Sequence, residues 1–171
     1  MTPLRMAALV LGAVLVQGAL ARFGGGGVAD LVLVAVVAVG LLHGRVAGLL
    51  AGTAAGLLQD ALGGGVLGLS GLGKSVAGYL TGMAGTQFIV TQWASRGLVF
   101  LGASVLNAAC FVGLSAALGL RRHPNPLMEI APQAAVNAAV GVLLFQAMEF
   151  TPAARDWWRA VLERRRKRRF H

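Results

Sequence analysis

The chain has 171 residues, of which 57% are hydrophobic and only 12% charged, and its formal net charge is +9. A soluble domain carries about 25% charged residues, so this composition excludes an ordinary soluble domain. Long apolar runs recur from residue 6 to residue 150 and leave no room for a separate soluble domain beside them. They predict an all-α, polytopic membrane protein.

Six transmembrane helices are predicted in chain order. They cover residues 5–21, 29–42, 46–62, 66–85, 97–119 and 129–150. Glycine runs break the chain after the first and third of them, and the two prolines of residues 121–126 mark a loop before the last. Only residues 43–45 separate the second predicted helix from the third, which indicates a tight hairpin. The first helix could be mistaken for a secretory leader, because Arg5 precedes its apolar core, but it is long enough to span a membrane.

Basic residues indicate the orientation. Residues 153–171 form a predicted juxtamembrane tail after a bundle over residues 1–152, and the tail holds eight of the fifteen Lys and Arg residues. Because positive residues favour the cytoplasmic side, the tail is predicted inside, and six helices place the N-terminus inside too. With Lys74 counted separately, eleven basic residues then lie inside and three outside, the three being Arg22, Arg121 and Arg122.

The end of the tail is a run of basic residues. It is predicted to contact anionic lipid headgroups rather than nucleic acid, because it lacks interleaved aromatic residues and any nucleic-acid-binding fold. The residues of this run are Arg164, Arg165, Arg166, Lys167, Arg168 and Arg169.

Lys74 stands out because it places an ammonium group inside an apolar stretch. Such a group costs about 2.5–3.5 kcal/mol at bilayer depth, so a nearby acidic partner is expected. Asp30, which begins the second helix, and Asp60, which ends the third, fall on the same outer side as Lys74 by connectivity, and either could pair with it. We expect this outer-face charge cluster to act as a stabilising ion pair or cap, or as a polar seat for a partner or substrate.

The charge cluster does not make an active site, since it lacks a histidine, a nucleophile and a second pair of carboxylates. No spacing of residues indicates a metal or a cofactor either. Other polar groups inside the predicted helices are expected to form hydrogen bonds between helices. They are Gln59, Asn107, Gln133, Asn137, Gln146 and Glu149. The single cysteine, Cys110, is predicted to be a small core residue.

Small residues line two neighbouring predicted helices. Gly48, Gly52 and Gly56 recur at four-residue spacing and share one helix face, and Gly78 and Gly82 repeat the theme in the fourth helix. Such faces let another backbone approach closely. The contact could be internal or with another chain. We expect an internal contact at Gly52 and docking of a partner toward Gly78 and Gly82.

A family resemblance is carried by several segments. They are Asp30-Leu31-Val32-Leu33-Val34, Gly40-Leu41-Leu42 before the tight turn, Ala55-Gly56-Leu57-Leu58-Gln59-Asp60, Leu67-Gly68-Leu69-Ser70, Lys74, and Gly78-Tyr79-Leu80. With these segments the region 28–85 resembles the rod shape-determining protein MreD family. The last two helices match in length and hydropathy only, and the basic tail is longer and more charged than the family pattern requires.

The resemblance implies a non-enzymatic inner-membrane scaffold of the bacterial cell-elongation complex, which supports lateral peptidoglycan synthesis and rod shape. It implies direct binding of MreC, a protein with a single span, in an assembly that also contains RodA, its transpeptidase and the MreB filament. It implies no cofactor, and a six-helix fold similar to the substrate-binding subunits of energy-coupling-factor transporters.

That fold similarity leaves an alternative function open, which is binding of a small molecule such as a vitamin for an energy-coupling-factor transporter. The cluster of Asp30, Asp60 and Lys74 could line a polar pocket at the outer end. Against this, the predicted outer region is poor in the Trp, Tyr and Asn residues that such pockets use to grip ligands.

Overall fold

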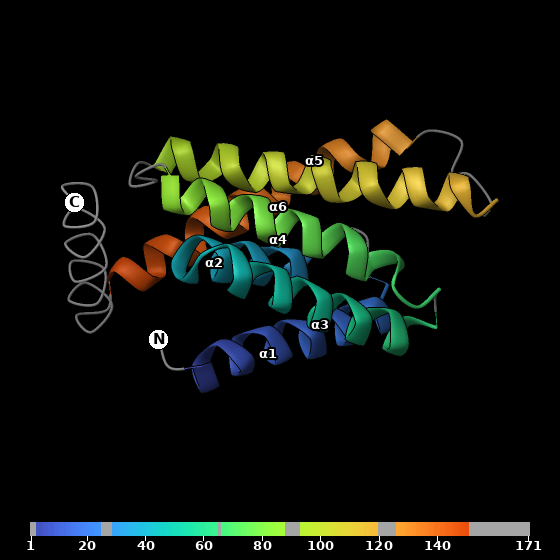
Figure 1. Ribbon diagram of the computed structural model, residues 1–171, viewed down its shortest axis with the longest axis horizontal. Coiled ribbons are helices and arrows are strands. Elements are labelled where there is room, and N and C mark those ends of the chain that lie inside the picture. The colour runs from blue at the N-terminus through green and yellow to red at the C-terminus, as the bar shows by residue number, and fades with distance from the viewer. Residues whose placement is uncertain (1–2, 25–28, 65, 88–92, 120–125, 151–171) are drawn as a thin grey trace.

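The computed structural model describes residues 3–24, 29–64, 66–87, 93–119 and 126–150. Within these residues the chain is all-helical and has no strand (Figure 1). Six helices follow one another as α1 (Pro3–Arg22), α2 (Leu31–His43), α3 (Arg45–Gly63), α4 (Leu69–Gln87), α5 (Trp93–Ala117) and α6 (Pro126–Phe150). The basic tail with its predicted lipid-binding run, and also Arg121 and Arg122, lie outside the described residues.

The helix ends follow the sequence signals, with three shifts of three or four residues at helix starts. Helix α4 begins at Leu69, three residues later than predicted. Helix α5 begins at Trp93, four residues earlier than predicted, and α6 begins at Pro126 instead of residue 129. Proline suits the first position of a helix, because its fixed φ is helical and its missing N–H would have no partner there.

Three helical segments are long and apolar enough to cross a membrane by length and composition: Arg45–Gly63, Ala94–Ala117 and Ile130–Ala147. Met6–Arg22 and Leu31–His43 are apolar but shorter. Helix α2 has 13 residues and is therefore only about 20 Å long. The six predicted helices are thus present, whereas their prediction as six membrane spans is not confirmed.

Helix α2 is the centre of the bundle. It contacts each of the other five helices, and every residue from Val32 to Leu42 is buried. A helix that is apolar all round needs such surroundings. Phe100 of α5 and Phe145 of α6 pack on one side of it, and Val10 and Val14 of α1 on another. Figure 1 shows α1 and α5 at opposite sides of the molecule, with α2, α3 and α4 between them.

Helices α3 and α4 make the most extensive helix contact in the described part of the chain, and glycine makes it possible. A side-chain carbon added at Gly52 would lie 2.7 Å from the backbone nitrogen of Ser75, much too close for any real side chain. Carbons added at Gly48 and Gly56 would likewise meet the backbone of α4. Gly52 therefore lies at an internal contact between α3 and α4. We call this contact the glycine seam.

The expectation that a partner docks toward Gly78 and Gly82 is wrong for this fold. Gly78 packs against Gly48, and a side-chain carbon at Gly82 would lie 2.5 Å from the backbone nitrogen of Arg45. Both glycines therefore belong to the glycine seam, and the backbone of α3 and of the turn before it occupies the space that a partner would need.

Candidate functional site

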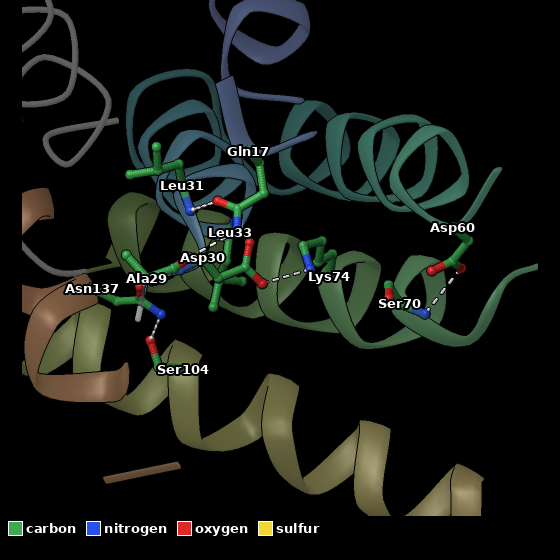
Figure 2. A network of polar contacts seen from close by, with 10 residues as sticks. All are labelled: Gln17, Ala29, Asp30, Leu31, Leu33, Asp60, Ser70, Lys74, Ser104 and Asn137. Atoms are coloured by element: carbon green, nitrogen blue, oxygen red, sulfur yellow. Dashed lines mark hydrogen bonds and ion pairs between the residues drawn. The ribbon is translucent and has the colours of Figure 1, made fainter. Parts of the chain in front are cut away.

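The buried ion pair between Lys74 and Asp30 is the core of the candidate site. Lys74 Nζ lies 2.7 Å from Asp30 Oδ2, and the lysine side chain is only 2% exposed (Figure 2). The other carboxylate oxygen, Oδ1, accepts a hydrogen bond of 2.9 Å from the backbone N–H of Leu33. Asp30 is therefore the N-cap of α2 as well as the partner of Lys74. Of the two partners left open by the sequence, the structure selects Asp30.

The start of α2 lies inside the bundle because a glutamine of α1 holds it there. Gln17 Nε2 donates to the carbonyl of Ala29, and Gln17 Oε1 accepts from the N–H of Leu31, both at 2.9 Å. Gln17 lies five residues before Arg22, where α1 ends. The start of α2, to which Gln17 is bonded, therefore lies roughly 7–8 Å from that end, measured along the axis of α1. Non-helical backbone this deep in an apolar bundle needs such hydrogen bonds, and the Gln17 side chain supplies them.

Two further helices join the same network. The N–H of Asp30 donates to Asn137 Oδ1 of α6 at 2.7 Å, and Asn137 Nδ2 donates to Ser104 Oγ of α5 at 3.1 Å. The hydrogen bond between helices that was expected of Asn137 is confirmed. Sequence reasoning missed Gln17 and Ser104. Gln17 could have been found in the same way as Asn137, since it is the one amide in the apolar run of α1.

Asp60 stands apart from the ion pair. Its Oδ2 accepts from the backbone N–H of Gly68 at 2.9 Å and of Ser70 at 3.1 Å. Figure 2 shows it at the end of α3, turned toward the first turn of α4 and apart from Lys74. A carboxylate there satisfies two N–H groups that the helix leaves unpaired and also faces the positive end of the helix dipole. The three predicted cluster residues therefore form one ion pair and one helix cap.

The cap at Asp60 gives a testable expectation. Replacing Asp60 by alanine should destabilise the protein by about 0.5–2 kcal/mol, because the N–H groups of Gly68 and Ser70 lose their acceptor. Asp60→Asn is the matched control, since an amide oxygen can still accept these bonds. Thermal unfolding in detergent should give the order wild type, Asn, Ala. Equal midpoints for the asparagine and alanine variants would show that the cap contributes nothing.

The family follows from the match of the whole bundle. The family model described as rod shape-determining protein MreD matches residues 4–150, which include all of the network above. The chain belongs to the MreD family. No curated protein and no solved structure matches it. The MreD family consists of membrane proteins that determine rod shape, and it is a structural family not known for enzymes.

The chemistry of the described residues agrees with a structural role in the MreD family. Asp30 and Lys74 neutralise each other, and Asp60 is bonded to backbone N–H groups. In the described ranges no group of three His, Cys, Asp or Glu side chains could hold a metal ion. What the arrangement does is to tie α1, α4, α5 and α6 to the first turn of α2.

Proposed function

We propose that this chain is a non-enzymatic scaffold subunit of the cell-elongation complex in the bacterial inner membrane. It binds MreC directly and thereby supports lateral peptidoglycan synthesis and rod shape. RodA, its transpeptidase and the MreB filament belong to the same assembly. The family match over residues 4–150 carries this proposal.

The polar network supports a scaffold better than a carrier of small molecules. A vitamin-binding subunit would need polar groups directed at a ligand. Here Asp30 and Lys74 form an ion pair with each other, and Asp60 accepts hydrogen bonds from the backbone at the start of α4. The network therefore supports a fixed arrangement of five helices, which is what a docking platform for another membrane protein requires.

We further propose that the six helices cross the membrane, with both termini in the cytoplasm, in a fold similar to the substrate-binding subunits of energy-coupling-factor transporters. The short α2 fits this arrangement, because α2 begins inside the bundle and its 13 residues need not span the whole apolar thickness. The distribution of basic residues, eleven inside and three outside, supports the orientation. The tail from residue 153 then lies against anionic lipid on the inner leaflet.

The orientation predicts which side of the membrane carries the loop around residue 125. Asn125→Cys, made on a Cys110→Ser background, should react with a membrane-impermeant maleimide in intact spheroplasts. The reason is that only α6 follows this loop, so a cytoplasmic C-terminus places the loop outside. A cysteine introduced at Arg45, in the turn between α2 and α3, is the control and should react only after lysis. Labelling of residue 125 only after lysis would contradict the six-span arrangement.

The proposed partner is tested by affinity purification of the tagged chain from its native membrane, followed by mass spectrometry. We expect MreC to be enriched most strongly, with RodA and its transpeptidase at lower levels. A parallel purification of an unrelated six-helix membrane protein corrects for nonspecific capture. Enrichment of an ATPase and a coupling subunit in place of MreC would favour the transporter alternative and overturn the proposal.

A further inference from the structure

One face of α5 changes character along its length. Residues spaced three and four apart share a helix face, and the first part of this inward face is buried. The buried part is Arg96, Phe100, Ala103 and Ser104. The same face is then partly exposed. We call this part the open inner face, and its residues are Asn107, Cys110, Phe111 and Leu114. The prediction of Cys110 as a core residue is therefore wrong, since it is half-buried.

The open inner face exists because α4 is shorter than α5 at this end. Gly73 of α4 lies against Asn107, since a side-chain carbon at Gly73 would come within 2.7 Å of Asn107 Oδ1. From Gly73, α4 extends only four residues back to Leu69, whereas α5 continues ten residues from Asn107 to Ala117. Figure 1 shows α5 reaching beyond the start of α4. The last turns of α5 therefore have no α4 beside them.

Two amides lie at one level of this opening. Helices α5 and α6 are antiparallel, and Ser104 is bonded to Asn137. Asn107 is three residues beyond Ser104, and Gln133 is four residues before Asn137, so both lie about one turn further toward the same end. Both are half-buried, and neither makes a hydrogen bond with any described residue. The bonds between helices that were expected of Asn107 and Gln133 are therefore not formed within the described chain.

In the proposed membrane arrangement, lipid would not satisfy these amides. Asn107 lies roughly 15 Å from the end of α5, which is about half the thickness of the apolar core of a bilayer. Headgroup and ester oxygens are that far away, and acyl chains offer no hydrogen bond. The neighbours Phe111, which is 40% exposed, and Leu114 make the opening apolar, so it does not favour water. The amides need a hydrogen-bonding partner, and the opening around them needs an apolar surface to cover it. A transmembrane helix that carries a polar side chain supplies both.

We propose that the open inner face of α5, together with Gln133 of α6 at the level of Asn107, docks one transmembrane helix of a second protein. That helix packs apolar side chains on Phe111 and Leu114 and places a hydroxyl or amide group at the level of the two amides. The inference rests on the proposed function for the identity of the second protein, which is taken to be MreC in the test.

The first test is photo-cross-linking in the native membrane with the full chain. Leu114→p-benzoylphenylalanine should cross-link to MreC on irradiation. Val105→p-benzoylphenylalanine is the matched control, because Val105 is 54% exposed on the opposite side of α5, and it should give no such product. Equal cross-linking from both positions, or cross-linking from position 114 only to phospholipid or to a second copy of this chain, would overturn the inference.

The second test separates docking from a structural role. Asn107→Leu and Gln133→Leu should each lower the affinity for purified MreC in nanodiscs about threefold to tenfold, as expected for the loss of one hydrogen bond between membrane helices. Their unfolding midpoints should not fall, because neither amide has a bond to lose within the chain. Gln146→Leu, an exposed amide further along α6, is the control and should change neither quantity.

The outcomes separate a failure of the docking face from a failure of the proposed scaffold function. If MreC binds the wild-type chain and both amide variants equally well, the docking face is wrong and the scaffold function stands. If the amide variants lower the unfolding midpoint together with the affinity, the amides act within the chain and the docking face is wrong. If MreC does not bind the folded wild-type chain at all, the proposed function fails and the docking face fails with it.

Discussion

Replacing Gly52 by leucine is expected to abolish folding of the bundle. The added side chain would have to displace the backbone of α4 at Lys74 and Ser75, since even its first carbon has no room. Separating α3 from α4 would also move Lys74 away from Asp30, and a buried charge would lose its partner. We expect degradation in cells and no monodisperse peak in detergent, and cells that depend on this variant should lose rod shape.

The matched control is Gly102→Leu. Gly102 is an exposed glycine of α5 with nothing within 4 Å of an added side-chain carbon, so leucine should be accommodated at that position without loss of stability. The comparison separates glycine at a close contact from glycine as general composition. If both variants fold equally well, the glycine seam does not hold α3 and α4 together.

The second large effect concerns the ion pair. Lys74→Met should destabilise the protein by about 3–5 kcal/mol, because the carboxylate of Asp30 is left buried without a counter-charge. The double variant Asp30→Asn/Lys74→Met should recover part of that loss. An asparagine at position 30 can still accept the N–H of Leu33, so the cap of α2 is retained while both charges are removed.

A double-mutant cycle with Asp30→Asn, measured by unfolding in detergent, gives the interaction directly. We expect a coupling of about 0.5–3 kcal/mol between positions 30 and 74. The cycle with Asp60→Asn and Lys74→Met is the control and should be additive, because Asp60 is bonded to the backbone of α4 and not to Lys74. Additive losses in the first cycle would show that the pair is not formed in solution.

Much of this arrangement follows from the sequence, because its signals are local. Apolar runs broken by glycine and proline place all six helices, and four-residue spacing of glycine identifies the face of α3 that meets α4. Connectivity alone brings Asp30, Asp60 and Lys74 to one end of the bundle. The cost of a charge in an apolar environment then requires a partner for Lys74.

What the sequence could not supply depends on contacts between distant segments. The choice of Asp30 over Asp60 depends on how deeply α2 begins, which Gln17 determines from another helix. The role of Gly78 and Gly82 depends on the relative rotation of α3 and α4, since a small face looks the same whether an internal helix or a partner covers it. The opening at Asn107 results from the unequal ends of α4 and α5, which no local pattern reveals.

The preformed bundle is proposed to bind MreC directly. This binding is tested by titrating purified MreC, labelled outside its single span, onto the chain in nanodiscs and following fluorescence anisotropy. We expect saturable binding by the wild-type and Gly102→Leu chains, weaker binding by Asn107→Leu, and none by empty nanodiscs. A folded wild-type chain that gives no more signal than empty nanodiscs would contradict direct binding.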